Sequence, residues 1–334
     1  MRRWVQLGCV LLLAAGAALV AGQAGGPAVA EWAPDGRIFI VGNGLLARFD
    51  LDSGEETLLD RRVEAFAFSP DGARLAVGGR GRLELRRYPG FEGESSPPLP
   101  SPSFGTADIT ALAWSPTLSL PNGSSDGATL AAGTAAGHIL LWDTQDNELW
   151  ADLNVEPASG VERLRFSADA RRLLTVFADG RAILWDLERR EEVHRYAPPR
   201  DEKAEPGTTT ELEDLSADGR LVLATRTPEQ GEPEVLLLDD RGAVEWKRAG
   251  YGVEFTRDGA GVLALVAPFR IAALYQTSDA AALRVFEPPE AVRTLYLVRQ
   301  SPDGKLLLGV GEDHQGQVLI VWDFATAAVL KIRR

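Results

Sequence analysis

The sequence predicts an all-β fold, a seven-bladed β-propeller of four-stranded antiparallel blades, preceded by an N-terminal signal segment. Three observations predict it. A Pro-Asp-Gly turn, or a close variant, recurs seven times at an average spacing of about 45 residues. Alternating apolar residues flank the turns, as in strands with one buried face. No long amphipathic period of about 3.6 residues follows residue 28, which argues against helices.

The first segment of the chain is an export signal. Arg2 and Arg3 precede an apolar stretch over 4–20, and small residues follow as far as Ala30. This order is typical of a secretory signal peptide. We therefore interpret 1–27 as a signal peptide or, alternatively, as an anchor that holds the protein to the membrane through residues 4–20. Both interpretations place 28–334 outside the cytoplasm, in the periplasm or the extracellular space.

The recurring turn is predicted to form the corner between the first two strands of each blade. Its copies end at residues 36, 72, 127, 170, 219, 259 and 304. Proline presets the first central φ, aspartate bonds back to the backbone, and glycine adopts the left-handed conformation. The fourth copy ends in Ala170. We expect strain there, because a left-handed alanine costs about 1 kcal/mol or more.

Two copies break the apolar alternation of the first strand. Glu213 and Gln300 fall where the register expects an apolar side chain. A one-residue bulge would restore burial to Leu212 in the fifth copy and to Leu295 and Leu297 in the seventh.

The order of the copies also predicts how the ring closes. The first recognisable strand, about 28–32, belongs to the innermost position of blade one, and 328–332 can supply the outer strand of blade seven. We therefore expect seven blades that are each continuous in sequence, without strand exchange. Closure would rest on side-chain packing alone, in a monomeric ring.

Three of the predicted third strands end in Trp-Asp, in phase with the corner: Trp142-Asp143, Trp185-Asp186 and Trp322-Asp323. With these pairs the chain resembles the WD-repeat propellers over about 29–333, as a degenerate bacterial member. Four lysines against 31 arginines are typical of a GC-rich bacterial genome. The pair is degenerate at Phe49-Asp50 and Leu238-Asp239, and no histidine stands at the position of the Gly-His pair that the family often has before the first strand. The resemblance implies the fold and a role in protein interaction.

Charge and cysteine content exclude some classes of function. The 35 basic and 48 acidic residues give a net charge of −13, which argues against a nucleic-acid partner, since phosphate binding needs a basic field. Cys9 is the single cysteine and lies in the leader. The domain over 28–334 therefore has neither a disulfide nor a thiolate site.

No combination of residues nominates a catalytic, cofactor or metal site. His138, His194 and His314 are dispersed along the chain, and neither HExxH, GxSxG nor a Gly-rich phosphate loop occurs. We therefore predict that the protein is not an enzyme and binds no cofactor.

An acidic bias over 201–240 is the clearest regional feature. Twelve acids and three bases give a charge of −9 in these forty residues. Much of it falls in two loops of the fifth blade, which predict an acidic rim that attracts a basic protein or peptide. The candidate rim residues are Asp201, Glu202, Glu205, Glu229, Glu232 and Glu234. Trp150 and Trp246, in outer-strand positions, are further interface candidates.

The sequence thus favours an exported, non-catalytic propeller that serves as a protein-interaction platform. Two alternatives stay open. One is an envelope propeller with ligand-binding or enzymatic activity in the central channel, similar to lactonase or quinoprotein types. The other is a companion of a cell-envelope machine, resembling the periplasmic propellers of the Tol system, which typically have six blades.

Overall fold

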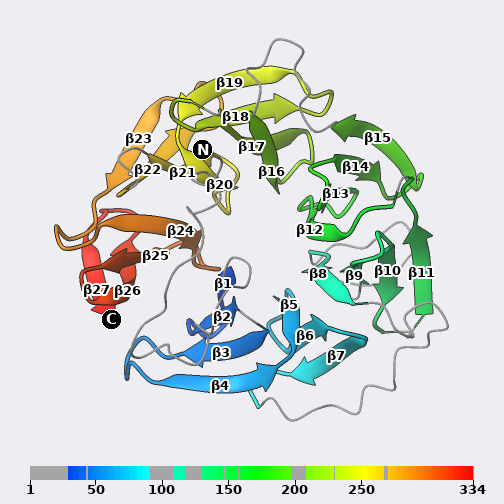
Figure 1. The fold of residues 1–334 in the computed structure, drawn as a ribbon, viewed down its shortest axis with the longest axis horizontal. Coiled ribbons are helices and arrows are strands. Elements are labelled where there is room, and N and C mark those ends of the chain that lie inside the picture. Colours follow the sequence, from blue (N-terminus) through cyan, green and yellow to red (C-terminus); the bar gives the residue numbers. More distant parts are fainter. Residues whose placement is uncertain are drawn as a thin grey trace, which may run out of the picture.

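Seven antiparallel sheets surround a central axis in the computed structural model (Figure 1). The structure describes residues 29–333 apart from 43, 91–107, 117–128, 146–147, 157, 197–207, 229 and 267–269. The signal segment over 1–27 lies outside these residues. The predicted all-β, seven-bladed propeller is confirmed, and seven blades differ from the six of the Tol-type alternative.

The strands of each blade run outward in sequence order. The innermost strands are β1 (Val29–Trp32), β5 (Val63–Phe68), β8 (Ile109–Trp114), β12 (Val161–Phe166), β16 (Thr209–Leu215), β20 (Tyr251–Phe255) and β24 (Thr294–Gln300). The second strands are β2 (Ile38–Gly42), β6 (Arg74–Gly79), β9 (Thr129–Thr134), β13 (Arg172–Phe177), β17 (Leu221–Thr227), β21 (Gly261–Val266) and β25 (Leu306–Asp313).

The outer half of each blade follows the same order. The third strands are β3 (Leu45–Phe49), β7 (Arg82–Arg87), β10 (Ile139–Asp143), β14 (Ala182–Asp186), β18 (Glu234–Asp239), β22 (Ile271–Gln276) and β26 (Gly316–Asp323). The outermost strands are β4 (Glu56–Arg61), β11 (Glu148–Leu153), β15 (Glu191–Tyr196), β19 (Val244–Ala249), β23 (Ala282–Phe286) and β27 (Val329–Arg333). Blade 2 shows three strands in the described part of the chain, because the segment after β7 falls within 91–107.

One hydrogen-bond network builds five of the corners. In blade 2, the Ser69 hydroxyl donates to Asp71 Oδ1 at 2.5 Å and accepts from the backbone N–H of Arg74 at 2.9 Å. The same hydroxyl–carboxylate pair recurs in blades 4 to 7, at Ser167, Ser216, Thr256 and Ser301. These bonds satisfy polar groups that the turn would otherwise bury unpaired, and they explain why the tetrapeptide repeats.

The corner of blade 1 has Ala33 in place of the hydroxyl residue, and the corners of blades 4 and 3 depart from the others in different ways. Ala170 has φ of 55° where most other corners place a left-handed glycine, so the expected strain is present. In blade 3 the sequence places the corner at 125–127, which lies outside the described residues. Ser115 occupies the hydroxyl position there, since its N–H donates to Thr129 O at 2.9 Å. An insertion therefore separates the two halves of this corner.

The innermost strands are bulged more widely than the sequence suggests. The predicted bulges occur between Leu212 and Asp214 and between Leu295 and Leu297. They bury Leu212 and Leu295, while Leu297 is half-buried. Similar register shifts interrupt every other described innermost strand except β1. Gln300 stays buried, because its amide donates to Gly304 O and accepts from a backbone N–H of blade 6.

The ring closes without strand exchange, as expected, but not by packing alone. A shared core joins blades 1 and 7. Polar contacts add to it: Trp32 Nε1 donates to Arg299 O at 3.0 Å, and Arg333 Nε donates to Leu51 O at 3.1 Å. Lys331 also pairs with Asp52. The prediction of closure by packing alone is therefore wrong, since hydrogen bonds and ion pairs hold the same seam.

Candidate functional site

Counting back from the corner identifies one equivalent position in every innermost strand. We identify the first corner residue of each blade by its backbone N–H, which donates to a backbone carbonyl at the start of the second strand. Two residues earlier stands a residue of the innermost strand, and the innermost strands surround the axis (Figure 1). We call these seven the axial residues: Glu31, Ala67, Ala113, Arg165, Asp214, Glu254 and Arg299.

The charged axial residues contact one another from blade to blade. Arg299 of blade 7 lies 3.3 Å from Glu254 of blade 6 (Nη1 to Oε2) and 3.5 Å from Glu31 of blade 1 (Nε to Oε1). Arg165 of blade 4 lies 3.6 Å from Asp214 of blade 5 (Nε to Oδ1). These pairs form two groups, one over blades 6, 7 and 1 and one over blades 4 and 5, which we together call the axial cluster. The two alanines occupy the same position in blades 2 and 3.

Backbone donors complete this cluster. Asp214 Oδ2 accepts from the N–H of Phe255 at 2.9 Å, and Glu254 Oε1 accepts from the N–H of Gln300 at 2.8 Å. Each carboxylate therefore bridges its own blade to the next one. Beside the cluster, Arg163 Nη1 lies 2.9 Å from Glu213 Oε2 and donates to Leu212 O at 2.8 Å. Glu213, the extra residue of the bulge in β16, thus has a partner in blade 4.

Burial and neighbouring charges around the axis shift the pKa values of three of these groups. Burial raises the pKa of Glu254 to about 7, against the opposing effect of Arg299. Burial also lowers the pKa of Arg165, although Asp214 and Glu31 oppose it. For Arg299, burial favours the neutral form, but Glu254 and Glu31 outweigh it and the pKa is raised. Glu254 is therefore a carboxyl group that titrates near neutrality.

The acidic rim is only partly within the described residues. Asp201, Glu202, Glu205 and Glu229 lie outside them. Glu232 is exposed, whereas Glu234 pairs with Arg226 and lies 2.8 Å from Lys247 Nζ. Thr209 pairs with Thr227 across β16 and β17, so the two acidic loops leave blade 5 at the same end.

The residues of the Trp-Asp pairs contribute to the core and to turns. Trp142, Trp185 and Trp322 are buried. The aspartates cap the turn that leads to the outermost strand: Asp143, Asp186 and Asp323 accept backbone N–H bonds two or three residues further on. Asp50 and Asp239 do the same in blades 1 and 5, where the tryptophan is replaced. The aspartate therefore shapes this turn with phenylalanine or leucine before it as well as with tryptophan.

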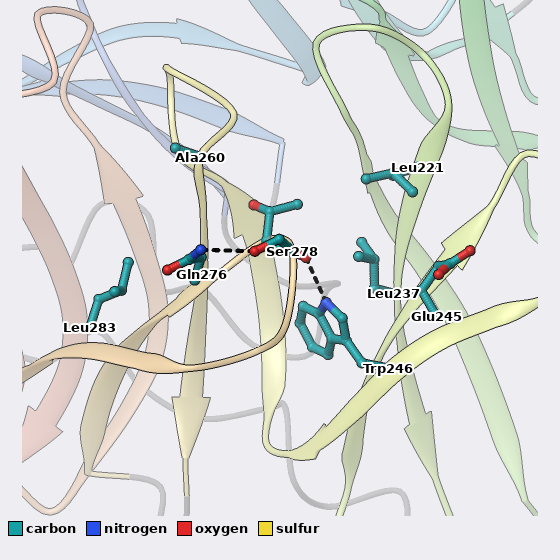
Figure 2. A pocket seen from close by; sticks show the side chains of 9 residues that line it. Leu221, Leu237, Glu245, Trp246, Ala260, Gln276, Ser278 and Leu283 are labelled. Carbon is teal, nitrogen blue, oxygen red and sulfur yellow. Dashed lines mark hydrogen bonds between the residues drawn. The ribbon is translucent and has the colours of Figure 1, made fainter.

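A groove of about 600 Å³ opens between blades 5 and 6 (Figure 2). One wall carries Trp246, Leu237 and Glu245 of blade 5, and Leu283 of blade 6 stands opposite. The indole Nε1 of Trp246 donates to Thr277 O at 2.8 Å, which fixes the ring across the blade boundary. Trp246 was an interface candidate from sequence, but its groove partners come from two blades and were not anticipated.

The arrangement offers two kinds of chemistry. The axial cluster places a carboxyl group with a near-neutral pKa, Glu254, beside the guanidinium group of Arg299. The groove places an indole and aliphatic side chains next to a carboxylate. Among the described residues no group of His, Cys, Asp or Glu side chains is disposed to hold a metal ion. No helix within the described part of the chain is long and apolar enough to cross a bilayer.

Aligning the copies on the corner residue would have found the axial cluster, because its members stand at the same position in each copy.

Neither a scan against protein-family models nor a search of curated proteins returned a match for this chain. The function is therefore argued from the geometry.

Proposed function

We propose that the protein is an exported, non-catalytic interaction platform, a degenerate relative of the WD-repeat propellers. The groove between blades 5 and 6 carries the proposal. It combines a held indole with the half-exposed side chain of Leu283, whose relative exposure is 51%. Large apolar side chains of this kind, gathered in a concave surface, are typical of protein interfaces.

The axial cluster supports the same function in a different way. Its arginines and carboxylates contact each other and the backbone of neighbouring blades, so these side chains join blades to one another. A rigid ring of this kind is a suitable scaffold for binding at loops and edges. The acidic rim over 201–240 is then a second surface that attracts basic partners.

Crosslinking in native cells followed by recovery of partners tests the platform. We expect Leu283→Asp to reduce the yield of crosslinked partners at least several-fold. Leu330→Asp is the matched control, since Leu330 is 54% exposed on the outermost strand of blade 7. Equal yields from the wild type and both variants would remove the groove from the proposal. Recovery from the soluble periplasmic, secreted or membrane fraction distinguishes the signal peptide from the anchor.

One observation favours the alternative of an active channel. A carboxyl group with a pKa of about 7 can act as a general acid or base at neutral pH, and Glu254 lies at the axis. In a lactonase-like reaction, Glu254 would act as this general acid or base. Hydrolysis of a panel of lactones and esters by the wild type, absent in Glu254→Gln, would establish this alternative, while the absence of turnover by the wild type would end it.

A further inference from the structure

The groove between blades 5 and 6 is already formed in the free protein. The Trp246 indole is held by Thr277 O, and the Thr277 hydroxyl donates to Gly259 O at 3.0 Å. Gln276 Nε2 donates to Ser278 Oγ at 2.8 Å, which orders the same turn (Figure 2). A partner would therefore lose little energy in organising this surface.

The groove suits one inserted apolar side chain. Leu221 and Leu237 line it together with the indole, and Leu283 is exposed at the opposite wall. Val285, further along β23, is 45% exposed and extends the apolar strip away from the groove. An extended segment lying along β23 could bury an anchor in the groove and contact this strip with a second residue.

Charge at the groove is acidic. Glu245 is the extra residue of a bulge on β19, between the residues that pair with Leu237 and Leu238 of β18. It is exposed, lines the groove and has no ion-pair partner among the described residues. The nearby cations are engaged: Lys247 pairs with Glu234, and Arg248 Nε donates to Ala280 O at 3.3 Å. The hairpins that border the groove, together with Glu245, hold five acids against two bases: Asp239, Asp240, Glu245, Asp258 and Asp279, with Arg241 and Arg257.

We infer that this groove binds an extended peptide segment of a protein partner in which an apolar anchor is flanked by lysine or arginine. The inference rests on the proposed platform function and names the chemistry of its partner. The anchor enters between Trp246 and Leu283, and the basic side chain pairs with Glu245. Because this pair would be solvent-exposed, it sets preference among peptides more than total affinity.

Synthetic peptides test the preference directly. Two fluorescent eight-residue peptides share a central phenylalanine in a Gly-Ser background and differ only in having lysine or glutamate on both sides of it. We expect the wild type to bind the lysine peptide about three- to five-fold more tightly than the glutamate peptide, as for a single exposed pair. Glu245→Lys should abolish or reverse this ratio, and added salt should shrink it.

Two control variants make the result specific. Glu191→Lys reverses an exposed charge on the outermost strand of blade 4 and should leave the ratio unchanged. Leu283→Asp should weaken both peptides, while Leu330→Asp should weaken neither. Circular dichroism and thermal unfolding of each variant verify that the fold is intact.

The outcomes separate the two proposals. No preference in the wild type, or an unchanged ratio in Glu245→Lys, overturns the basic partner. If the ratio is unchanged while Leu283→Asp still loses crosslinked partners in cells, the platform stands and its partner chemistry is different. If Leu283→Asp changes neither peptide binding nor crosslinking, both proposals fall.

Discussion

The two sides of the ring hold their blades together by different means. Blades 4 to 7 and blade 1 are joined near the axis by charged side chains, with Arg299 between Glu31 and Glu254. Blades 1 and 2 are joined by an aromatic cluster in which Phe39 meets Phe68 edge-on, with ring centroids 4.9 Å apart. The axial position in blades 2 and 3 is alanine.

This difference teaches that one backbone position can serve two kinds of interface. A charge next to the axis is tolerated where a neighbouring blade supplies an oppositely charged side chain or a backbone N–H. Thr110 and Trp114 complete the apolar side by donating to carbonyls of adjacent blades, at 2.5 and 3.1 Å. The two sides should therefore respond differently to mutation, pH and salt.

The largest effect is expected on the aromatic side. Phe39 is fully buried, so Phe39→Ala should leave a cavity and lower the free energy of unfolding by about 4 kcal/mol. Urea unfolding at several pH values and salt concentrations measures it. The loss should be the same under all conditions, and a strong dependence on salt would contradict the division of the ring into two kinds of interface.

On the charged side, Arg299→Ala removes the shared partner of Glu31 and Glu254. We expect a loss of about 3 kcal/mol in urea unfolding, because two crowded carboxylates are left without their cation. Arg220→Ala, at an exposed corner position, is the control and should cost little. The double variant Arg299→Met with Glu254→Gln should recover part of the loss, and failure of any recovery would argue against the pair as its cause.

The pH dependence of stability isolates Glu254. Its folded-state pKa is about 7 against an ordinary value of 4.5, so the folded state holds the proton more tightly than the unfolded chain. The stabilisation is complete below pH 4.5 and is lost as the pH rises to 7, by about 3 kcal/mol in total. Compared with the wild type, Glu254→Gln should lack this loss and be the more stable protein above pH 7. Parallel pH profiles for the two proteins would contradict this.

The smallest effect is expected at the boundary between the two sides, in the corner of blade 4. Ala170→Gly should raise the free energy of unfolding by about 0.5–1 kcal/mol, because glycine accepts the left-handed φ of 55° without strain. Thermal unfolding of the variant measures the gain. Gly219→Ala, at the equivalent corner of blade 5 with φ of 69°, is the reverse control and should destabilise.

Much of the fold could be predicted from local patterns. The corner residues, the alternation before them and the Trp-Asp pairs each report on one blade, and their recurrence gives the number of blades. Bulges at Leu212 and Leu295 were also predictable, because a single misplaced polar residue disturbs a period of two. The bulges in blades 2 to 4 and 6 disturb no visible pattern of apolar residues, so they could not be predicted from local alternation.

The sites were harder to predict, because they depend on neighbours in space. Arg299 and Glu31 are separated by almost the whole chain and meet only when the ring closes. Leu283 is an ordinary apolar residue of an outermost strand until blade 5 places Trp246 beside it. The acidic rim was visible in composition, whereas the pairing of Glu234 with Arg226 and Lys247 required the registers of β17, β18 and β19.

The continuity of each blade has a consequence for how the gene can be rearranged. A single residue separates β4 from β5, and a single residue separates β19 from β20, so neighbouring blades need almost no spacer. Joining residue 333 to residue 29 by a few glycines, and opening the chain between 88 and 108 instead, would leave every described sheet whole. Such a circular permutant should fold to the same ring, with its new ends between the second and third blades, where a surface or a reporter can be attached.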